Sequence, residues 1–139
     1  MKRIVASAFV VFALSATPAH ASTFKCQQWM PMAMRVGFKK SDLKDLDRIM
    51  YRESRCAPGA KHYNKRNGKV WSTDKGLMQV NDYSWVTYLR NLKIIKSSED
   101  LLHPETNLRA AKALYDYSVK RGYNRWHQWR TFGGGSYAK

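Results

Sequence analysis

A single Asn-Gly pair, Asn67-Gly68, restricts the fold of this chain more than any other feature of the sequence. The pair lies between the segments HYNKR and KVWST. Asn-Gly between two strand-like segments is the strongest short-range signal for a β-hairpin with a tight turn. The segments on both sides of this hairpin repeat apolar residues at helical spacing instead. The sequence therefore predicts an α+β fold, mainly α, with one small antiparallel β-hairpin.

Four segments carry the helical pattern. Pro and Gly residues mark their ends, since Pro suits a first helical turn and Gly suits the position after the last. Ser41 is the predicted N-cap of the second helix, because its hydroxyl can accept a hydrogen bond from a backbone N–H of the first turn. Ala57-Pro58-Gly59 would end that helix. The predicted helical segments are 24–36, 42–56, 84–92 and 104–119.

The second helix carries an acid on its apolar stripe. Leu43, Leu46, Ile49 and Met50 repeat at helical spacing, and the next position on the stripe is Glu53. A carboxyl that is carried towards the interior is desolvated, which raises its pKa and suits it to act as a general acid. The alternative is a half-exposed structural glutamate that pairs with a neighbouring arginine, Arg52 or Arg55.

A second acid, Asp74, lies just past the predicted hairpin, in the segment STDKGLMQVN at 72–81. Glycoside cleavage requires a proton for the leaving oxygen and, in many enzymes, a second carboxylate near the developing oxocarbenium ion. The hairpin would bring Asp74 across a cleft from Glu53, and the amides of Gln79 and Asn81 suit the hydroxyl and N-acetyl groups of sugars. The alternatives are a turn residue at Asp74 and two amides that satisfy backbone groups.

The first 21 residues fit a secretory signal peptide. Lys2 and Arg3 precede an apolar run at 4–14, and Ala19-His20-Ala21 fits a small-residue cleavage site. The apolar run is short for a membrane-spanning helix, so an uncleaved anchor is the weaker alternative. We therefore expect one domain at 22–139 that is periplasmic or secreted.

The cysteine count agrees with export. Cys26 and Cys56 are the two cysteines of the chain, and an even count in an oxidising compartment predicts one disulfide. Such a bond would stabilise the fold by about 3–4 kcal/mol in the chain-entropy model. The alternative, a thiol nucleophile at Cys56, has no histidine adjacent to it in the sequence.

The charge points to an anionic partner. The chain has 25 Lys and Arg against 10 Asp and Glu, and a formal net charge of +15. Such a field attracts nucleic acid, acidic lipid or an anionic cell-wall polymer, and export argues against nucleic acid. The net charge indicates which partners the chain attracts, and it does not indicate which reaction the chain catalyses.

The segments described above, in their order, resemble the soluble lytic transglycosylase (SLT) family of the lysozyme superfamily. The resemblance rests on YRESRCAPGA, DKGLMQVN, Trp85 and LLHPETNLRAA and extends over roughly 26–114. Within the family, the chain resembles the small exported members associated with wall-spanning secretion systems. STDKGLMQVN also resembles the segment that carries the second catalytic acid of animal-type lysozymes. The resemblance implies a lysozyme-like fold, a peptidoglycan substrate, Glu53 as catalytic acid with Ser54 beside it, and Gln79 in the cleft.

The C-terminal part departs from the family pattern. The late tyrosine motif, usually Ala-Tyr-Asn followed by a small residue and glycine, is present as GYNRW, so the resemblance places Tyr123 in that role with Arg125 and Trp126 after it. Tyr123, Trp126 and Trp129 have the chemistry to stack on sugar rings, but aromatic residues at this spacing more often belong to a core. Asp74 is not a general requirement of transglycosylases.

The leading prediction is an exported lytic transglycosylase that cleaves the bond between N-acetylmuramic acid and N-acetylglucosamine. Glu53 would protonate the bridging oxygen and then deprotonate the muramic 6-hydroxyl, which closes an anhydro ring. One alternative is a lysozyme-type muramidase that uses Glu53 and Asp74 to activate water. The other is a non-enzymatic cationic protein that binds walls or membranes.

No cofactor or metal is expected, because His62, His103 and His127 show no metal-ligand spacing. The expected partners are peptidoglycan glycan strands and a wall-spanning or secretion-system assembly. We expect a monomer that does not bind nucleic acid.

Overall fold

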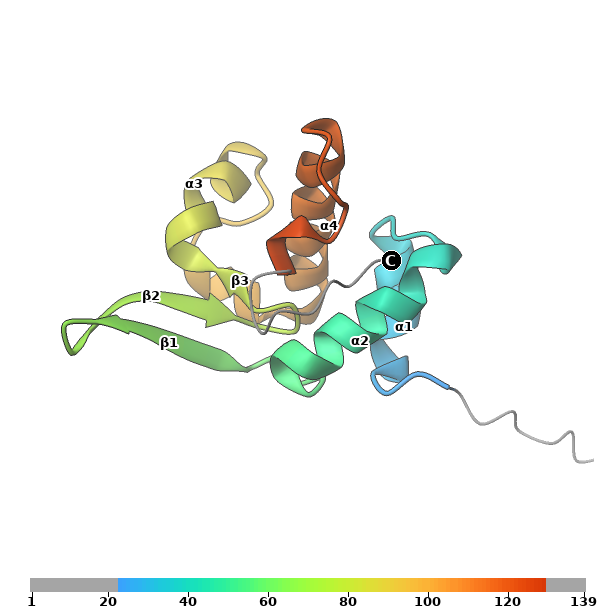
Figure 1. Cartoon of the computed structure of the whole chain (residues 1–139), viewed down its shortest axis with the longest axis horizontal. Helices are drawn as coiled ribbons and strands as arrows, with labels where there is room; N and C mark the ends of the chain where they lie inside the picture. The colour runs from blue at the N-terminus through green and yellow to red at the C-terminus, as the bar shows by residue number, and fades with distance from the viewer. Residues whose placement is uncertain (1–22, 130–139) are drawn as a thin grey trace, which may run out of the picture.

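The computed structural model describes residues 23–129 of the 139-residue chain, so the predicted signal peptide at 1–21 lies outside the described residues. This part is mainly helical with one small antiparallel sheet (Figure 1), which confirms the predicted fold class. In chain order the elements are η1 (Gln27–Trp29), α1 (Met30–Arg35), η2 (Lys40–Asp42), α2 (Leu43–Ser54), β1 (Lys61–Arg66), β2 (Lys69–Lys75), β3 (Val80–Asn81), α3 (Asp82–Asn91), η3 (Ser98–Leu102), α4 (Pro104–Lys120) and η4 (His127–Trp129).

The predicted hairpin is present and is part of a three-stranded sheet of order β1-β2-β3. Asn67 and Gly68 form its turn with φ values of 50° and 74°, as a tight hairpin turn of the type I′ class requires. The placement of Asp74 past the second strand was wrong. Asp74 lies within β2, opposite His62 of β1 and Asn81 of β3.

A β-bulge interrupts the hairpin. Asn64 pairs with Ser72 and Lys65 pairs with Val70, so Trp71 is the extra residue of β2. A bulge shifts the strand register by one residue and therefore turns the following side chains to the other face. His62 and Asn64 consequently share a face of the sheet with Asp74.

The starts of the first two helices differ from the predictions. The first segment begins at η1 and α1 instead of residue 24, and Gly37 follows it with φ 108°. Ser41 is not an N-cap, because it lies inside η2. The side chain of Asp42 accepts the hydrogen bond of the Lys39 backbone N–H at 3.0 Å instead. An acid one residue after the expected cap therefore satisfies this backbone donor.

The second helix ends earlier than predicted. α2 stops at Ser54, where Arg55 and Cys56 take the left-handed backbone conformation with φ values of 54° and 65°. Ala57-Pro58-Gly59 follows the helix and does not end it. The early stop turns Cys56 towards the N-terminal segment, where it forms the predicted disulfide with Cys26.

The core lies between α2, α4 and the turn that joins β2 to β3. Leu46, Met50, Leu77, Leu108 and Leu114 are among its fully buried side chains. In the view of Figure 1, α3 and α4 lie on one side of the inner end of the sheet and α2 lies on the other, while the hairpin extends away from the helices.

A buried asparagine fixes the turn between β2 and β3. Asn107 of α4 donates to the backbone carbonyls of Lys75 and Leu101, both at 2.8 Å, and accepts from the backbone N–H of Met78 at 2.8 Å. Both the amide nitrogen and the amide oxygen of Asn107 therefore bond to backbone groups. Within residues 23–129, none of the helices has the length and apolar character needed to cross a membrane.

Candidate functional site

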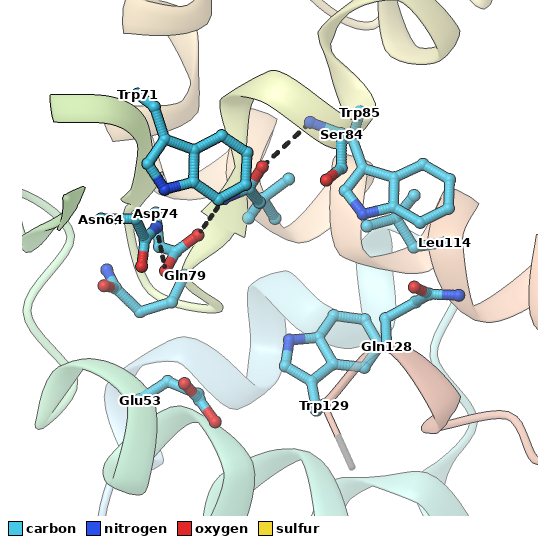
Figure 2. Close-up of a pocket in the computed structure, with 12 residues that line it drawn as sticks. Glu53, Asn64, Trp71, Asp74, Gln79, Ser84, Trp85, Leu114, Gln128 and Trp129 are labelled. Carbon is cyan, nitrogen blue, oxygen red and sulfur yellow. Dashed lines mark hydrogen bonds between the residues drawn. The ribbon is translucent and has the colours of Figure 1, made fainter. Parts of the chain in front are cut away.

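A cavity of about 320 Å³ lies where α2, the sheet, α3 and the C-terminal turn η4 meet (Figure 2). A second cavity of about 310 Å³ adjoins it and is lined by Arg52 and His62. Glu53, Asp74 and Gln79 line both cavities, so these three predicted site residues lie between them. The first cavity is lined by Glu53, Asn64, Trp71, Asp74, Gln79, Val80, Asn81, Ser84, Trp85, Leu114, Gln128 and Trp129.

Glu53 comes from the last turn of α2, and its side chain is 14% exposed. The guanidinium of Arg52 donates to Oε1 of Glu53 through Nε at 3.1 Å and also through Nη2. The same Nη2 donates to the backbone carbonyl of Trp129 at 3.0 Å. The half-buried position and the pairing with Arg52 are thus both present, and Arg52 fixes the orientation of the carboxylate. Within residues 23–129, no side chain or backbone group donates a hydrogen bond to Oε2 of Glu53.

Asp74 is buried and each of its carboxylate oxygens accepts one hydrogen bond from an amide. Asn81 donates to Oδ1 at 2.6 Å, and Asn64 donates to Oδ2 at 3.0 Å. In the part of the chain that the structure describes, no Lys, Arg or His forms an ion pair with Asp74. Asp74 is therefore a carboxylate held by neutral donors at the wall of the cavity, and not a turn residue that bonds its own backbone.

Asn81 holds Asp74 and caps a helix at the same time. Its Oδ1 accepts from the backbone N–H of Ser84 at 2.9 Å at the start of α3. Its Nδ2 donates to Asp74 and to the hydroxyl of Ser72, the latter at 3.1 Å. The amide of Asn81 thus positions the acid. Asn81 also lines the first cavity, and its contact with sugar stays a prediction.

Gln79 presents one end of its amide to the cavity. Its Nε2 donates to the backbone carbonyls of Ala60 at 3.1 Å and of Gly76 at 2.9 Å. Gln79 has a φ of 47°, and Figure 2 draws its side chain beside Asp74. Both bonds use the nitrogen, so Oε1 is the group of Gln79 that a ligand can reach.

The structure places the other predicted site residues away from both cavities. Ser54 is buried, and its hydroxyl donates back along α2 to the carbonyl of Met50 at 3.1 Å. Tyr123 is 53% exposed and stacks on His127, with ring centroids 4.6 Å apart.

The two late tryptophans have different positions. Trp126 is a core residue that stacks against Phe38 at 5.9 Å. Trp129 is also buried, but it forms a wall of the first cavity and donates from Nε1 to the carbonyl of Met78 at 2.8 Å.

Several cavity residues were not predicted as site residues, among them Asn64, Trp71, Ser84 and Gln128. Asn64 and Trp71 escape a sequence argument because the β-bulge decides which face of the hairpin they occupy. With unbroken alternation Trp71 would point to the face opposite Asp74. The Asn67-Gly68 turn was the available signal for the hairpin, but it carries no information about the bulge.

No group of three or more His, Cys, Asp or Glu side chains within residues 23–129 is arranged to hold a metal ion. The chain matches the model of a domain family described as "Lysozyme like domain" over residues 30–131. No curated protein matches the chain. The matched span contains every residue that lines the two cavities.

Proposed function

Because the chain belongs to the lysozyme-like domain family, whose members act on peptidoglycan as glycosidases or transglycosylases, we propose that it is a peptidoglycan lytic transglycosylase. The proposed reaction cleaves the bond between N-acetylmuramic acid and N-acetylglucosamine. One observation carries this proposal. Glu53 of α2 and Asp74 of β2 line the same cavity, which is also bordered by Trp71, Trp85 and Trp129, and carbohydrate-cleaving sites combine carboxylates with such apolar faces.

Glu53 acts first as the general acid. Arg52 donates only to Oε1 in the bonds between these two side chains, so Oε2 is the oxygen that carries the proton to the glycosidic oxygen. The bond between that oxygen and the muramic C1 breaks, and N-acetylglucosamine leaves as an alcohol. Positive charge develops at C1, where the carboxylate of Asp74 stabilises it electrostatically.

Glu53 then acts as the general base. Its carboxylate removes the proton of the muramic 6-hydroxyl, the oxygen attacks C1, and a 1,6-anhydro ring closes. The proton that Glu53 gave in the first step is thereby recovered. Activation of a water molecule by the same carboxylate would give hydrolysis, and Asp74 favours this second candidate because its position suits a lysozyme-type pair of acids.

Products from isolated peptidoglycan separate these functions. The mature protein is incubated with purified walls, and the soluble fragments are weighed by mass spectrometry. Anhydro-muramic ends are expected, reducing muramic ends would establish a hydrolase, and the absence of fragments would leave a non-enzymatic cationic binder.

Glu53→Gln is the decisive variant. The amide cannot supply the proton, so cleavage should fall at least about 100-fold. Its carbonyl oxygen can still accept hydrogen bonds from Arg52, so the free energy of unfolding should change by only about 1 kcal/mol. An active but unstable variant would show that Glu53 is a structural residue.

Export, place of action and assembly also belong to this proposal. We infer that the protein acts in the periplasm or after secretion, as a monomer on glycan strands beside a wall-spanning assembly. The N-terminal sequence of protein purified from the extracytoplasmic fraction should begin at residue 22. An intact N-terminus would contradict this inference.

A further inference from the structure

We propose that Arg66 binds a carboxylate carried by the muramyl substituent of the peptidoglycan strand, at a rim site next to the cavity. This inference rests on the proposed function. It adds that the protein recognises a carboxylate of the substrate, a group that the residues lining the cavity do not bind. Arg66, Trp71 and Tyr83 make up this site, which we call the Trp71 rim.

Trp71 connects the rim to the cavity. It lines the cavity together with Glu53 and Asp74 (Figure 2) and is 43% exposed. Its position follows from the β-bulge, since it is the extra residue of β2, and bulges commonly redirect a side chain beside an active site. A sugar bound in the cavity would therefore have Trp71 as a neighbour.

Two side chains contact Trp71 at the rim. The guanidinium carbon of Arg66 lies 5.2 Å from the centroid of the Trp71 ring. The ring of Tyr83, which is 73% exposed, packs edge-on against Trp71 with centroids 5.2 Å apart. Stacking on an aromatic ring holds the planar guanidinium in place, so less side-chain freedom is lost when it binds a ligand.

The guanidinium of Arg66 stacks on Trp71. Within residues 23–129, no carbonyl or carboxylate accepts a hydrogen bond from this guanidinium. By contrast, Lys61 on the same strand pairs with Glu99 at 3.1 Å. A guanidinium presents a planar fork of N–H groups that fits the two oxygens of a carboxylate. Trp71 thus holds the guanidinium of Arg66 in place, and the N–H groups of this guanidinium are accessible to a ligand.

The surrounding sequence supplies no acid for this fork. Between Glu53 and Asp74 the chain contains no Asp or Glu, and Lys65 and Lys69 adjoin Arg66 at the hairpin tip. The rim is therefore complementary to an anion. Peptidoglycan carries carboxylates on its stem peptides, or on the lactyl group where the peptide has been removed, and both project from the muramyl ring. Such a carboxylate is the occupant that the Trp71 rim fits.

Binding to a non-cleaving protein tests the inference separately from catalysis. Glu53→Gln protein is titrated with soluble uncrosslinked peptidoglycan strands, native or with their carboxylates converted to neutral amides by carbodiimide coupling to methylamine. Quenching of tryptophan fluorescence reports binding. Native strands should bind about three to five times more tightly than amidated strands, the range of a solvent-exposed ion pair. Adding Arg66→Gln should remove this difference.

Two control variants separate a built site from general attraction. Lys69→Gln removes one positive charge from the position that pairs with Arg66, and it should retain most of the preference for native strands. Arg66→Lys keeps the charge but loses the stacked fork, so it should restore less than half of the preference. Equal effects of Lys69→Gln and Arg66→Gln, full restoration by lysine, or equal binding of both strands would overturn the inference. If the parent protein released no fragments from peptidoglycan while the Glu53→Gln protein still preferred native strands, only the proposed function would be refuted.

Discussion

Asp74 accepts one hydrogen bond at each carboxylate oxygen, and both donors are side-chain amides of neighbouring strands. Asp74→Asn places an amide nitrogen against Asn64 or Asn81, where two donors then face each other. We expect the free energy of unfolding to fall by about 1–2 kcal/mol, because one buried donor loses its acceptor. Turnover should fall by more than tenfold, because the charge opposite the oxocarbenium ion is lost.

Steady-state cleavage of isolated walls and unfolding in urea measure the two effects of Asp74→Asn on one protein. A folded variant with full turnover would show that Asp74 only organises the sheet. In that case the charge of Asp74 plays no part in the reaction, and the transglycosylase mechanism proceeds with Glu53 alone.

The turn between β2 and β3 depends on the absence of a side chain at Gly76. Gly76 has a φ of 77°, and a Cβ there would lie 2.2 Å from the carbonyl oxygen of Leu101 and 2.3 Å from Nδ2 of Asn107. Gly68 has a similar φ of 74°, but a Cβ there would meet no atom within 4 Å. The two glycines therefore separate backbone strain from steric crowding.

Gly68→Ala should cost about 1–2 kcal/mol, the cost of a left-handed conformation for a residue with a Cβ. Gly76→Ala should cost more than about 3 kcal/mol, because it also displaces the buried Asn107 that fixes the turn. Chemical unfolding of both variants checks this difference. Equal losses would mean that Asn107 can move without cost.

Lys75 joins β2 to two other elements. Its side chain is 6% exposed, and its ammonium nitrogen lies 3.3 Å from a carboxylate oxygen of Asp82 and 2.8 Å from one of Glu99. Burial lowers the pKa of Lys75, but the hydrogen bonds and charges of Glu99 and Asp82 outweigh burial and raise it above 10.5. Hydrogen bonds from Lys75 and Lys61 lower the pKa of Glu99 below 4.5. The charged forms of Lys75 and Glu99 are therefore both favoured between pH 4.5 and pH 10.5.

The sign of the pH dependence follows from these shifts. A raised lysine pKa stabilises the fold below about pH 10 and loses that effect as pH rises through the folded pKa, and a lowered glutamate pKa acts above about pH 5 and is lost as pH falls. Lys75→Met should therefore lower the free energy of unfolding at pH 7 by about 1–3 kcal/mol. It should also flatten the loss of stability above pH 10. An unchanged alkaline limb would contradict the role given to Lys75.

At the scale of the whole molecule, the disulfide ties the N-terminal segment to the end of the helix that carries Glu53. Cys26 and Cys56 are separated by 30 positions in the chain. Cys26→Ser with Cys56→Ser should lower the free energy of unfolding by about 3–4 kcal/mol. Titration of the unfolded, unreduced protein should detect no free thiol. Two reactive thiols, or an unchanged stability on reduction, would contradict this prediction.

The sequence by itself determined the helices, the hairpin turn, the cysteine pairing and the position of Glu53 on an apolar stripe. Each of these depends on local chemistry: the period of an α-helix, the left-handed preference of Asn67-Gly68, and an even number of cysteines. The match of residues 30–131 to the lysozyme-like domain family agrees with the resemblance of the ordered motifs. The cap at Ser41 was wrong because Asp42, one residue later, satisfies the same kind of donor.

The tertiary structure decided which side chains surround the two acids. Side chains alternate along a strand, so the one-residue bulge at Trp71 reverses the hairpin face and brings Asn64 to Asp74. The bond from Arg52 to the carbonyl of Trp129 joins residues 77 positions apart, and it depends on how α2 packs against η4. Helical period acts within a few residues, whereas strand register and helix packing are set by contacts between distant segments. The full set of residues that line the cavity was therefore decided by the tertiary fold and could not be predicted from the local sequence.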